Sequence, residues 1–280
     1  NDYKKFAEIS EDFNPLHHNR QYAVKYGDGN NIVPLHLIIS PISRIAGMNF
    51  PGTPSLYLDH TVRAINQLQY NKLITYSARI TSVNVNKRIL TFRVLGLSEN
   101  KLIFDAKIQT HSLRNEWEQE LDFKIIKNPS KKRVFITGAS GEIATSIAKI
   151  FQENGWSLLL QKRGDNKSKN NITEDEKNTD NLTIDADLNN KKGLKKVLKT
   201  IGDLKDLKAI IHTASPPVTG DLNDLVNVNY TALKSITEKV LPQMLINQCG
   251  VIALIGSSAM VTQVDGFEDY VASKSMAANY

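Results

Sequence analysis

The chain has 280 residues, which is enough for about two domains. Its hydrophobic share of 41% and charged share of 23% are typical of a globular protein with a sizeable core. The single cysteine, Cys249, excludes a disulfide framework and a cysteine-ligated zinc site. A net charge of +6 is spread along the chain without an arginine-rich stripe, so we interpret it as solvated surface and expect no nucleic-acid partner.

Targeting signals are not visible in the sequence. No apolar run approaches the roughly 20 residues that span a bilayer, and no signal peptide is present. We therefore expect a cytoplasmic protein without a membrane partner. Because the chain begins at Asn1 instead of methionine and stops at Tyr280, we also expect it to be cut at both ends.

The first half of the chain predicts helices followed by antiparallel strands. Helical spacing runs from Tyr3 to Ile9, and an apolar helix is predicted from Leu35 to Ile45, with Pro34 in its first turn and a kink at Pro41. Strands are predicted over 56–62, 73–83, 88–95 and 102–110. The second strand alternates Ile74, Tyr76, Ala78 and Ile80 with polar residues, which indicates a half-buried strand and an α+β domain.

A basic stretch over 124–133, KIIKNPSKKR, separates the two halves and indicates a linker. It predicts a first domain over 1–124, a linker over 125–132 and a second domain over 133–280. After it, short apolar strands alternate with helices. The strands are expected over 134–136, 157–160, 182–184, 209–211 and 251–255, and the helices over 143–151, 194–201 and 228–245, with a polar surface loop over 164–181. This alternation indicates a parallel sheet covered on both faces.

The second half carries a strand, a glycine turn and a helix in the run RVFITGASGEIA over 133–144, where Ile143, Ile147 and Ile150 share one helix face. Glycine lets the backbone approach a pyrophosphate, and the helix N-terminus supplies free N–H groups. Farther along, the run YVASK places Tyr270 and Lys274 on one face of a helix. A nearby ammonium group favours the phenolate form, although a surface pair on an ordinary helix is the alternative.

These motifs together resemble the short-chain dehydrogenase/reductase family over about 133–280. The matching pieces are TGASGEIA (137–144), Asp187-Leu188, HTAS (212–215), Asn229 in NVNY, IGSS (255–258) and YVASK (270–274). The resemblance implies a doubly wound Rossmann sheet that binds NAD(P). It implies Tyr270 as the catalytic acid/base, Lys274 as the group that assists it and binds the nicotinamide ribose, Ser257 as the group that orients the substrate carbonyl and Asn229 as support for a proton relay.

The resemblance also implies a set of cofactor contacts, and several departures bear on them. The contacts are Gly138, Ser140, Gly141, Ile143, Asp187, Leu188 and Ala214, together with Tyr270 and Lys274. Glu142 stands where the family has glycine and could repel a phosphate, and His212 replaces an asparagine and is interpreted as a packing residue. Arg163 follows the second strand, where an acid is typical of NAD sites, so NADP(H) is favoured over NAD(H) unless Arg163 points to solvent.

The run FAEISEDFNPLHHNRQYA near the N-terminus holds an acid and an imidazole, Asp12 and His17. Such a pair can act as acid and base on one water molecule, one residue accepting a proton while the other donates one. The alternative is that Asp12 only caps the turn at Asn14. No metal-ligand spacing is present. The run resembles the MaoC-like (R)-specific enoyl-CoA hydratases, a hotdog-fold family, over about 1–112. The resemblance implies Asp12 and His17 as the catalytic pair, Asn14 as an aid to their geometry, a buried central helix and a dimer.

One departure affects this first domain. The family has Ala-His-Gly at the start of the central helix, and this chain has Val33-Pro34-Leu35, so only the Leu35 amide is offered to a thioester oxygen. His36 is interpreted as a core histidine. An active hydratase and a degenerate acyl-binding or dimerising domain both remain open.

The two resemblances predict a bifunctional enzyme of acyl-CoA or acyl-carrier-protein thioesters. The second domain would reduce a 3-oxoacyl thioester and the first would dehydrate the (3R)-hydroxyacyl product, in an assembly of at least two copies. The alternatives are a reductase of a sugar or polyketide carbonyl with a non-catalytic hotdog module, and a non-enzymatic NADP-binding scaffold, against which Ser257, Tyr270 and Lys274 argue. Because the family's substrate-binding region is not in the sequence, we expect residues 1–280 alone to lack reductase activity.

Overall fold

The computed structural model describes residues 2–113, 131–164, 180–262 and 264–280. The chain divides into two compact units, Asn1–Ile126 and Lys127–Tyr280, and each is described by itself. Most of the linker predicted over 125–132 and most of the surface loop predicted over 164–181 lie outside the described residues. In the part that is described, no helix is long and apolar enough to cross a membrane.

The first unit opens with short helices, two of which begin at an asparagine cap. They are α1 (Asp2–Ser10), the 3₁₀ turn η1 (Pro15–His17), α2 (Arg20–Tyr26), α3 (Leu35–Ile39) and α4 (Pro41–Met48). Asn14 accepts from Leu16 N–H, and Asn19 accepts from Tyr22 N–H. The single bent helix predicted for 35–45 is two helices instead, because Pro41 lacks an N–H group and starts a new helix. Pro34 precedes α3 as its cap residue and is not in its first turn.

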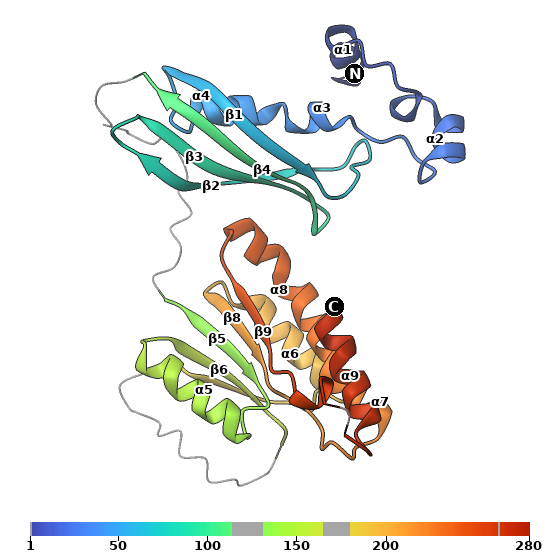
Figure 1. Cartoon of the computed structure of the whole chain (residues 1–280), viewed down its shortest axis with the longest axis vertical. Coiled ribbons are helices and arrows are strands. Elements are labelled where there is room, and N and C mark those ends of the chain that lie inside the picture. The colour runs from blue at the N-terminus through green and yellow to red at the C-terminus, as the bar shows by residue number, and fades with distance from the viewer. Residues whose placement is uncertain (1, 114–130, 165–179, 263) are drawn as a thin grey trace. The chain divides into compact units, whose positions relative to one another are not determined.

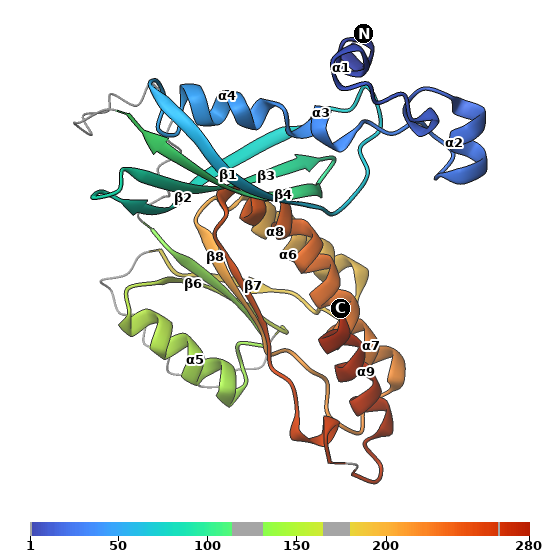
Figure 2. The same cartoon turned by 45° about the horizontal axis from the view of Figure 1, so that its top comes forward.

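Four strands form the sheet of this unit, in the antiparallel order β1-β4-β3-β2. They are β1 (Ser55–Ala64), β2 (Thr75–Asn84), β3 (Ile89–Ser98) and β4 (Lys101–Ser112). Helices α3 and α4 lie along one face of the sheet (Figures 1 and 2). Their Ile38 and Ile42 pack against Phe92 and Phe104 of the sheet. This helix-on-sheet packing is the hotdog arrangement that the resemblance implies.

The alternation predicted for the second strand holds over most of its length. Ile74, Tyr76 and Ala78 pack against the core of the unit. Ile80 is instead 39% exposed, and it is the last residue before the register with β3 shifts between Ile80 and Ser82. A bulge of this kind turns the following side chains to the other face of the sheet.

The second unit is a five-stranded parallel sheet with the order β7-β6-β5-β8-β9. Its strands are β5 (Arg133–Thr137), β6 (Ser157–Lys162), β7 (Leu182–Asp185), β8 (Leu207–His212) and β9 (Val251–Leu254). Helix α5 (Glu142–Glu153) covers one face, and α6 (Lys191–Asp203) and α8 (Leu233–Asn247) cover the other. The strand order reverses between β5 and β8, where ligands of doubly wound sheets bind. The predicted fold class is confirmed.

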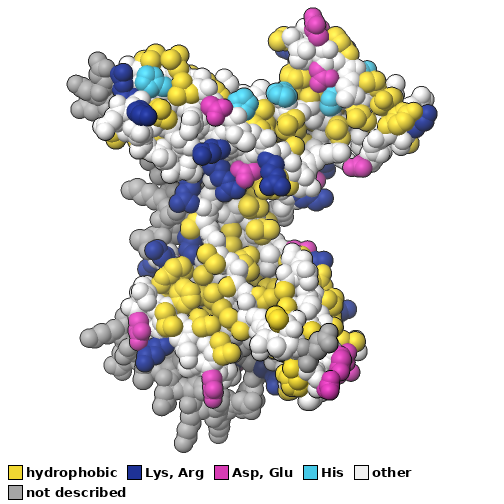
Figure 3. Space-filling view, in the orientation of Figure 1, with side chains coloured by type: hydrophobic (Ala, Val, Ile, Leu, Met, Phe, Trp, Pro, Cys, Tyr) yellow, Lys and Arg dark blue, Asp and Glu magenta, His cyan; other side chains and the backbone are white. Residues whose placement is uncertain are grey.

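Helix α5 packs through a different face from the predicted one. Of the three isoleucines predicted to share one face, Ile147 packs against the core, and Ile143 and Ile150 are 58% and 59% exposed. Ala144 and Ala148 are buried instead, because their small side chains let the helix approach the sheet closely. Figure 3 shows hydrophobic side chains gathered on the face of this unit that carries β5 and β9.

The helix predicted for 228–245 is interrupted at its start. It follows α7 (Leu222–Val226) and begins as a π-helical turn, η2 (Asn227–Ala232), before α8 continues it. Turns of this type often occur at functional sites. The last helix, α9 (Glu268–Asn279), carries the YVASK run.

Candidate functional site

A pocket of about 310 Å³ opens in the second unit where strands β5, β6 and β8 end. Its lining includes seven of the residues predicted to contact a cofactor, namely Gly138, Ser140, Gly141, Arg163, Asp187, Leu188 and Ala214. It also includes residues that the sequence analysis missed, namely Gln161, Thr213, Ser215, Pro216 and Val228. Ile143 is not among the lining residues and lies on the exposed side of α5.

Glycine is required at the first position of the turn. Gly138 has a φ of 63°, and a Cβ atom added there would lie 2.7 Å from the Ala214 Cα atom. The turn closes with a hydrogen bond of 3.0 Å from Gly141 N–H to the Gly138 carbonyl, and Gly141 precedes α5. The backbone of β5 therefore approaches the end of β8 directly, and the first N–H groups of α5 remain available to an anion.

The side chain of Gln161 forms hydrogen bonds to two sides of this pocket. It is 2% exposed, and its Oε1 atom accepts from Gly138 N–H at 2.8 Å. Its Nε2 atom donates to the Ala186 carbonyl at 2.6 Å. The carboxamide thus connects the glycine turn to the residues just after β7. The sequence feature that could have indicated Gln161 is a polar residue at the end of the apolar run LLLQ of β6, since a central strand of a parallel sheet is usually apolar.

His212 ends β8 as a neutral, fully hydrogen-bonded residue. Its Nε2 atom lies 3.0 Å from the Val228 carbonyl, which only accepts, so this nitrogen carries the proton. Its Nδ1 atom then accepts from Thr137 Oγ1 at 3.0 Å. That oxygen in turn accepts from Thr213 N–H and Ala214 N–H, both at 3.2 Å. Burial first, and the charge of Lys274 second, lower the pKa of His212 to about 4.

The structure brings Tyr270 and Lys274 together on α9. Lys274 is 2% exposed, and its Nζ atom lies 5.8 Å from the centroid of the Tyr270 ring. The ammonium donates to the Ile255 carbonyl at 3.1 Å, and burial lowers its pKa. Ser257 lies just beyond Ile255, and its Oγ atom accepts from Ala259 N–H at 3.2 Å. The serine hydroxyl therefore keeps its own proton to donate.

Asn229 joins the π-helical turn to α9. It is buried, and its Nδ2 atom donates to Ser273 Oγ at 2.9 Å. The Ser273 hydroxyl donates to the Tyr270 carbonyl at 2.8 Å. Within the described residues, the Asn229 Oδ1 atom is buried without a hydrogen-bond partner. Asn229 thus reaches the backbone that carries Tyr270, and it retains one acceptor that protein groups do not use.

The acid and imidazole of the first unit also lie together. Asp12 Oδ2 and His17 Nε2 are 3.7 Å apart, with side-chain exposures of 38% and 10%. His17 Nδ1 donates to the Ile32 carbonyl at 2.8 Å, so Nε2 is the accepting nitrogen when the ring is neutral. Asn14 N–H donates to Asp12 Oδ1 at 3.2 Å and orients the carboxylate. The pair is close enough for one oxygen atom to contact both groups.

The segment that starts α3 departs from the prediction in one respect. Leu35 is the first residue of α3, so its N–H group is one of those that lack a partner within the helix. His36 is exposed, and its interpretation as a core histidine is wrong. The reason is that α3 turns its buried face, with Pro34 and Ile38, toward the sheet.

Residues 132–280 match the family described as short chain dehydrogenase, and this match includes all the residues that line the pocket of the second unit. The chain belongs to the short-chain dehydrogenase family. Two residues of this short-chain dehydrogenase bear on how its pocket departs from the family pattern. Glu142 is exposed and does not line the pocket, and Arg163 does line it, at the end of β6.

Curated relatives match each half separately. Coniferyl-alcohol dehydrogenase of a Pseudomonas species is 26% identical over 115 residues, which is 41% of this chain and 40% of that protein. The (R)-specific enoyl-CoA hydratase of Aeromonas caviae is 31% identical over 86 residues, which is 31% of this chain and 64% of that protein. The hydratase of Rhodospirillum rubrum is 24% identical over 102 residues, 36% of this chain and 71% of that protein. The chain therefore spans less than two thirds of the first two relatives.

Solved structures divide in the same way. The (R)-hydratase from A. caviae involved in PHA biosynthesis is 25% identical with a TM-score of 0.38, over 39% of this chain and 83% of that one. A short-chain dehydrogenase from Sphingobium yanoikuyae in complex with NADPH is 24% identical with a TM-score of 0.47, over 52% and 61%. The predicted resemblances of the first half to (R)-specific hydratases and of the second half to short-chain dehydrogenases are confirmed.

Proposed function

We propose that the two units perform consecutive steps on one acyl thioester. The second unit reduces a 3-oxoacyl thioester, and the first unit removes water from the (3R)-hydroxyacyl product to give a trans-2-enoyl thioester, or runs in reverse. One observation carries the proposal. The chain that holds Tyr270 beside Lys274 also holds Asp12 and His17 at 3.7 Å in a unit similar to (R)-specific enoyl-CoA hydratases. The acyl group would be carried by coenzyme A or by an acyl carrier protein.

The pocket of the second unit fits a dinucleotide. Gly138 leaves no side chain between the turn and Ala214, and the N-terminus of α5 faces the same opening with its unbonded N–H groups. When bound, a nicotinamide dinucleotide supplies the hydride. Arg163 would bind the 2′-phosphate, because a guanidinium group at the end of β6 stands where NAD-specific sites place an acid. We therefore propose NADP(H) as the preferred cofactor.

The residues of α9 and β9 would handle the proton of this reduction. Ser257 would donate a hydrogen bond to the substrate carbonyl and hold its oxygen next to Tyr270. Tyr270 would then give its phenolic proton to that oxygen. Lys274 is held by the Ile255 carbonyl against the tyrosine ring, and its positive charge would stabilise the phenolate that remains. Asn229 would support the return of a proton through its unused Oδ1 atom.

In the first unit, Asp12 and His17 would share one water. Since Ile32 holds His17 Nδ1 as a donor, Nε2 would accept the proton as the water oxygen bonds to C3 of the enoyl group. The same nitrogen would then give that proton to C2, so that the elements of water add across the double bond. Asp12 would accept a hydrogen bond from the second hydrogen of the water, which stays on the oxygen as the new hydroxyl group, and would fix the position of the water. Dehydration is the reverse of these steps.

The exposed edge of the sheet in the first unit supports a dimer. The edge strand β1 exposes Leu56, Tyr57 and Leu58 by 50%, 42% and 49%. An exposed apolar edge is a ready partner for another strand, so we propose at least a homodimer formed through the first unit. We propose the cytoplasm as the compartment, since acyl thioesters and NADPH are available there.

Hydration of crotonyl-CoA tests the first unit directly. We expect (3R)-hydroxybutyryl-CoA from the native protein and a loss of at least about 100-fold in kcat for Asp12→Asn, since Asp12 positions the water for the acid–base step of His17 and such catalysis contributes on this scale. Absence of hydration by the native protein would instead favour a non-catalytic acyl-binding module beside a reductase of another carbonyl compound.

A further inference from the structure

The side chain of Tyr3, on α1, contacts both members of the Asp12–His17 pair. Its hydroxyl donates to the Asp12 carbonyl at 3.1 Å. Its ring lies 6.0 Å from the His17 ring, measured between centroids, at an angle of 51°. The same hydroxyl lies 3.0 Å from His18 Nδ1, and since it gives its one proton to the carbonyl, this nitrogen is the donor of the second bond. One side chain thus reaches Asp12 through its backbone and His17 through its ring.

The chain turns sharply after α1, which brings Asp12 back against the helix. Glu11 has a φ of 57°, a left-handed conformation that is strained for a residue with a side chain. Its N–H group donates to the Ala7 carbonyl at 2.9 Å, and Asp12 N–H donates to Ser10 Oγ at 3.3 Å. Strain of this kind is typical of functional sites. Helix α1 therefore holds the N–H group of Asp12 through Ser10 and its carbonyl through Tyr3.

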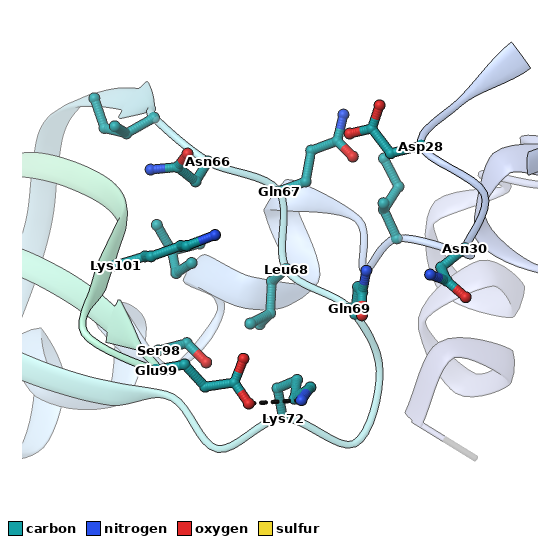
Figure 4. A pocket seen from close by; sticks show the side chains of 13 residues that line it. Asp28, Asn30, Asn66, Gln67, Leu68, Gln69, Lys72, Ser98, Glu99 and Lys101 are labelled. Atoms are coloured by element: carbon teal, nitrogen blue, oxygen red, sulfur yellow. Dashed lines mark hydrogen bonds and ion pairs between the residues drawn. The ribbon is translucent and has the colours of Figure 1, made fainter.

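The Tyr3 ring also packs against the segment that positions His17. Tyr70 meets it edge-on, with 6.4 Å between ring centroids and 73° between ring planes. The preceding residue, Gln69, pairs with Ile32 in an isolated bridge, and the Ile32 carbonyl accepts the His17 Nδ1 proton at 2.8 Å. Figure 4 shows Gln69 in the lining of a pocket of about 440 Å³, whereas the Tyr70 ring contacts Tyr3. The segment that fixes His17 through Ile32 therefore also supports Tyr3.

The separation of the acid and the imidazole decides whether they can act together. Asp12 Oδ2 and His17 Nε2 are 3.7 Å apart, and the proposed reaction needs one oxygen atom to contact both groups. A displacement of about 1 Å between reacting groups can cost a large factor in rate. Tyr3 can hold this separation because its hydroxyl stays protonated and continues to donate. Burial first, and the charge of Asp12 second, raise the pKa of Tyr3.

We propose that Tyr3 is a positioning residue of the hydratase reaction, which fixes the backbone of Asp12 through its hydroxyl and the ring of His17 through its own ring. In this role Tyr3 acts through Asp12 and His17 and does not touch the substrate. The proposal rests on the proposed hydratase function of the first unit. The alternative is a purely structural contact that joins α1 to the rest of the unit without any effect on the pair.

The test compares Tyr3→Phe, which removes only the hydroxyl, with the control Tyr22→Phe, which removes a tyrosine hydroxyl from α2 outside these contacts. Hydration of crotonyl-CoA is measured in both. We expect a kcat about 10-fold lower in Tyr3→Phe and a KM within about twofold, since a displaced carboxylate slows the chemical step without weakening substrate binding. Tyr3→Leu, which also removes the ring, should lower kcat further. The control should behave as the native protein.

A positioning role and a structural role differ in how Tyr3→Phe combines with Asp12→Asn. If the Tyr3 hydroxyl acts through Asp12, removing it should change kcat by less than about twofold once Asp12→Asn is present. A structural contact would lower kcat by the same factor in both backgrounds. An unchanged kcat in Tyr3→Phe, or an equal loss in the native and Asp12→Asn backgrounds, would overturn the proposal. An equal kcat in Tyr3→Phe and Tyr3→Leu would overturn the role of the ring.

Nuclear magnetic resonance separates this proposal from the proposed function, because it follows the contacts of Tyr3 without any activity. In Tyr3→Phe we expect shifts in the amide signal of Phe13, which directly follows the Asp12 carbonyl, and in the ring signals of His17. Both sets of signals should stay in place in Tyr22→Phe. If they shift in Tyr3→Phe but the native protein hydrates no thioester, the contact stands and the hydratase function fails. If the native protein hydrates crotonyl-CoA and neither signal shifts, the function stands and the positioning role is overturned.

Discussion

The side chain of Gln161 accepts a hydrogen bond from Gly138 N–H at 2.8 Å, inside a strand that is otherwise apolar. Its other end donates to the Ala186 carbonyl at 2.6 Å. One buried carboxamide therefore fixes the glycine turn against the residues that lead to Asp187. In the proposed complex, it sets the spacing between the phosphate side and the adenine side of the dinucleotide.

Gln161→Leu should weaken dinucleotide binding more than it weakens the fold around the pocket. The substitution leaves Gly138 N–H and the Ala186 carbonyl without their partner, and each unpaired buried group costs about 1–3 kcal/mol. We expect the Kd for NADPH to rise at least about 10-fold in a fluorescence titration. Gln152→Leu on α5, away from the pocket lining, serves as the control. An unchanged Kd for Gln161→Leu would show that the turn is positioned without this bridge.

Gly138→Ala should destabilise the second unit and block the pocket. The φ of 63° and the 2.7 Å approach to Ala214 Cα leave no room for a methyl group without a backbone shift. We expect the free energy of unfolding in urea to fall by at least about 1–2 kcal/mol and NADPH binding to be lost. Gly164→Ala is the matched control, because a Cβ atom there meets nothing within 4 Å. Equal stability of the two variants would contradict the close approach of β5 to β8.

Arg163 should discriminate between the two nicotinamide cofactors. Arg163→Ala removes the positive charge that lines the pocket at the end of β6. We expect the Kd for NADPH to rise about 10-fold while the Kd for NADH stays nearly constant, because only NADPH carries the 2′-phosphate. The same titration with both cofactors measures the ratio. A similar change for both would mean that Arg163 acts on the fold of the pocket and not on the phosphate.

Stability of the second unit should fall as the pH drops below about 6.5, the ordinary pKa of a histidine. His212 has its pKa lowered to about 4 by burial, so between these values the unfolded chain binds a proton that the folded chain does not. This contribution is fully present above pH 6.5. It would decrease by about 2 kcal/mol between pH 7 and pH 5, as an order of magnitude.

Urea unfolding at the two pH values measures this loss, and His212→Asn provides the comparison. The asparagine does not titrate, so its variant should lose less stability over the same range. An equal loss in both proteins would place the pH dependence in other groups.

The fold and most of the pocket could be predicted because both rest on local patterns. The glycine turn, the apolar strands and the YVASK run each carry their geometry in a few neighbouring residues. The spacing of Asp12 and His17 follows in the same way from the turn at Asn14, whose side chain caps η1.

The remaining features depend on contacts between distant segments. The bridge from Gln161 to Ala186 appears only when β6 and β7 pair. The exposure of Ile143 and Ile150 follows from how closely α5 approaches the sheet, which periodicity alone does not fix. His36 is exposed because it lies off the helix face that buries Ile38 and Ile42, and the almost wholly apolar run 35–45 does not show from the sequence which face is buried.

The central claim is that both units act in sequence on one thioester. Because we expect residues 1–280 alone to lack reductase activity, the intact parent protein would be incubated with acetoacetyl-CoA and NADPH, and the acyl products identified by mass spectrometry. We predict both 3-hydroxybutyryl-CoA and crotonyl-CoA from the native protein, 3-hydroxybutyryl-CoA alone from Asp12→Asn, and neither from Tyr270→Phe. Failure of the native protein to form any acyl product, or formation of crotonyl-CoA undiminished in Asp12→Asn, would contradict the account.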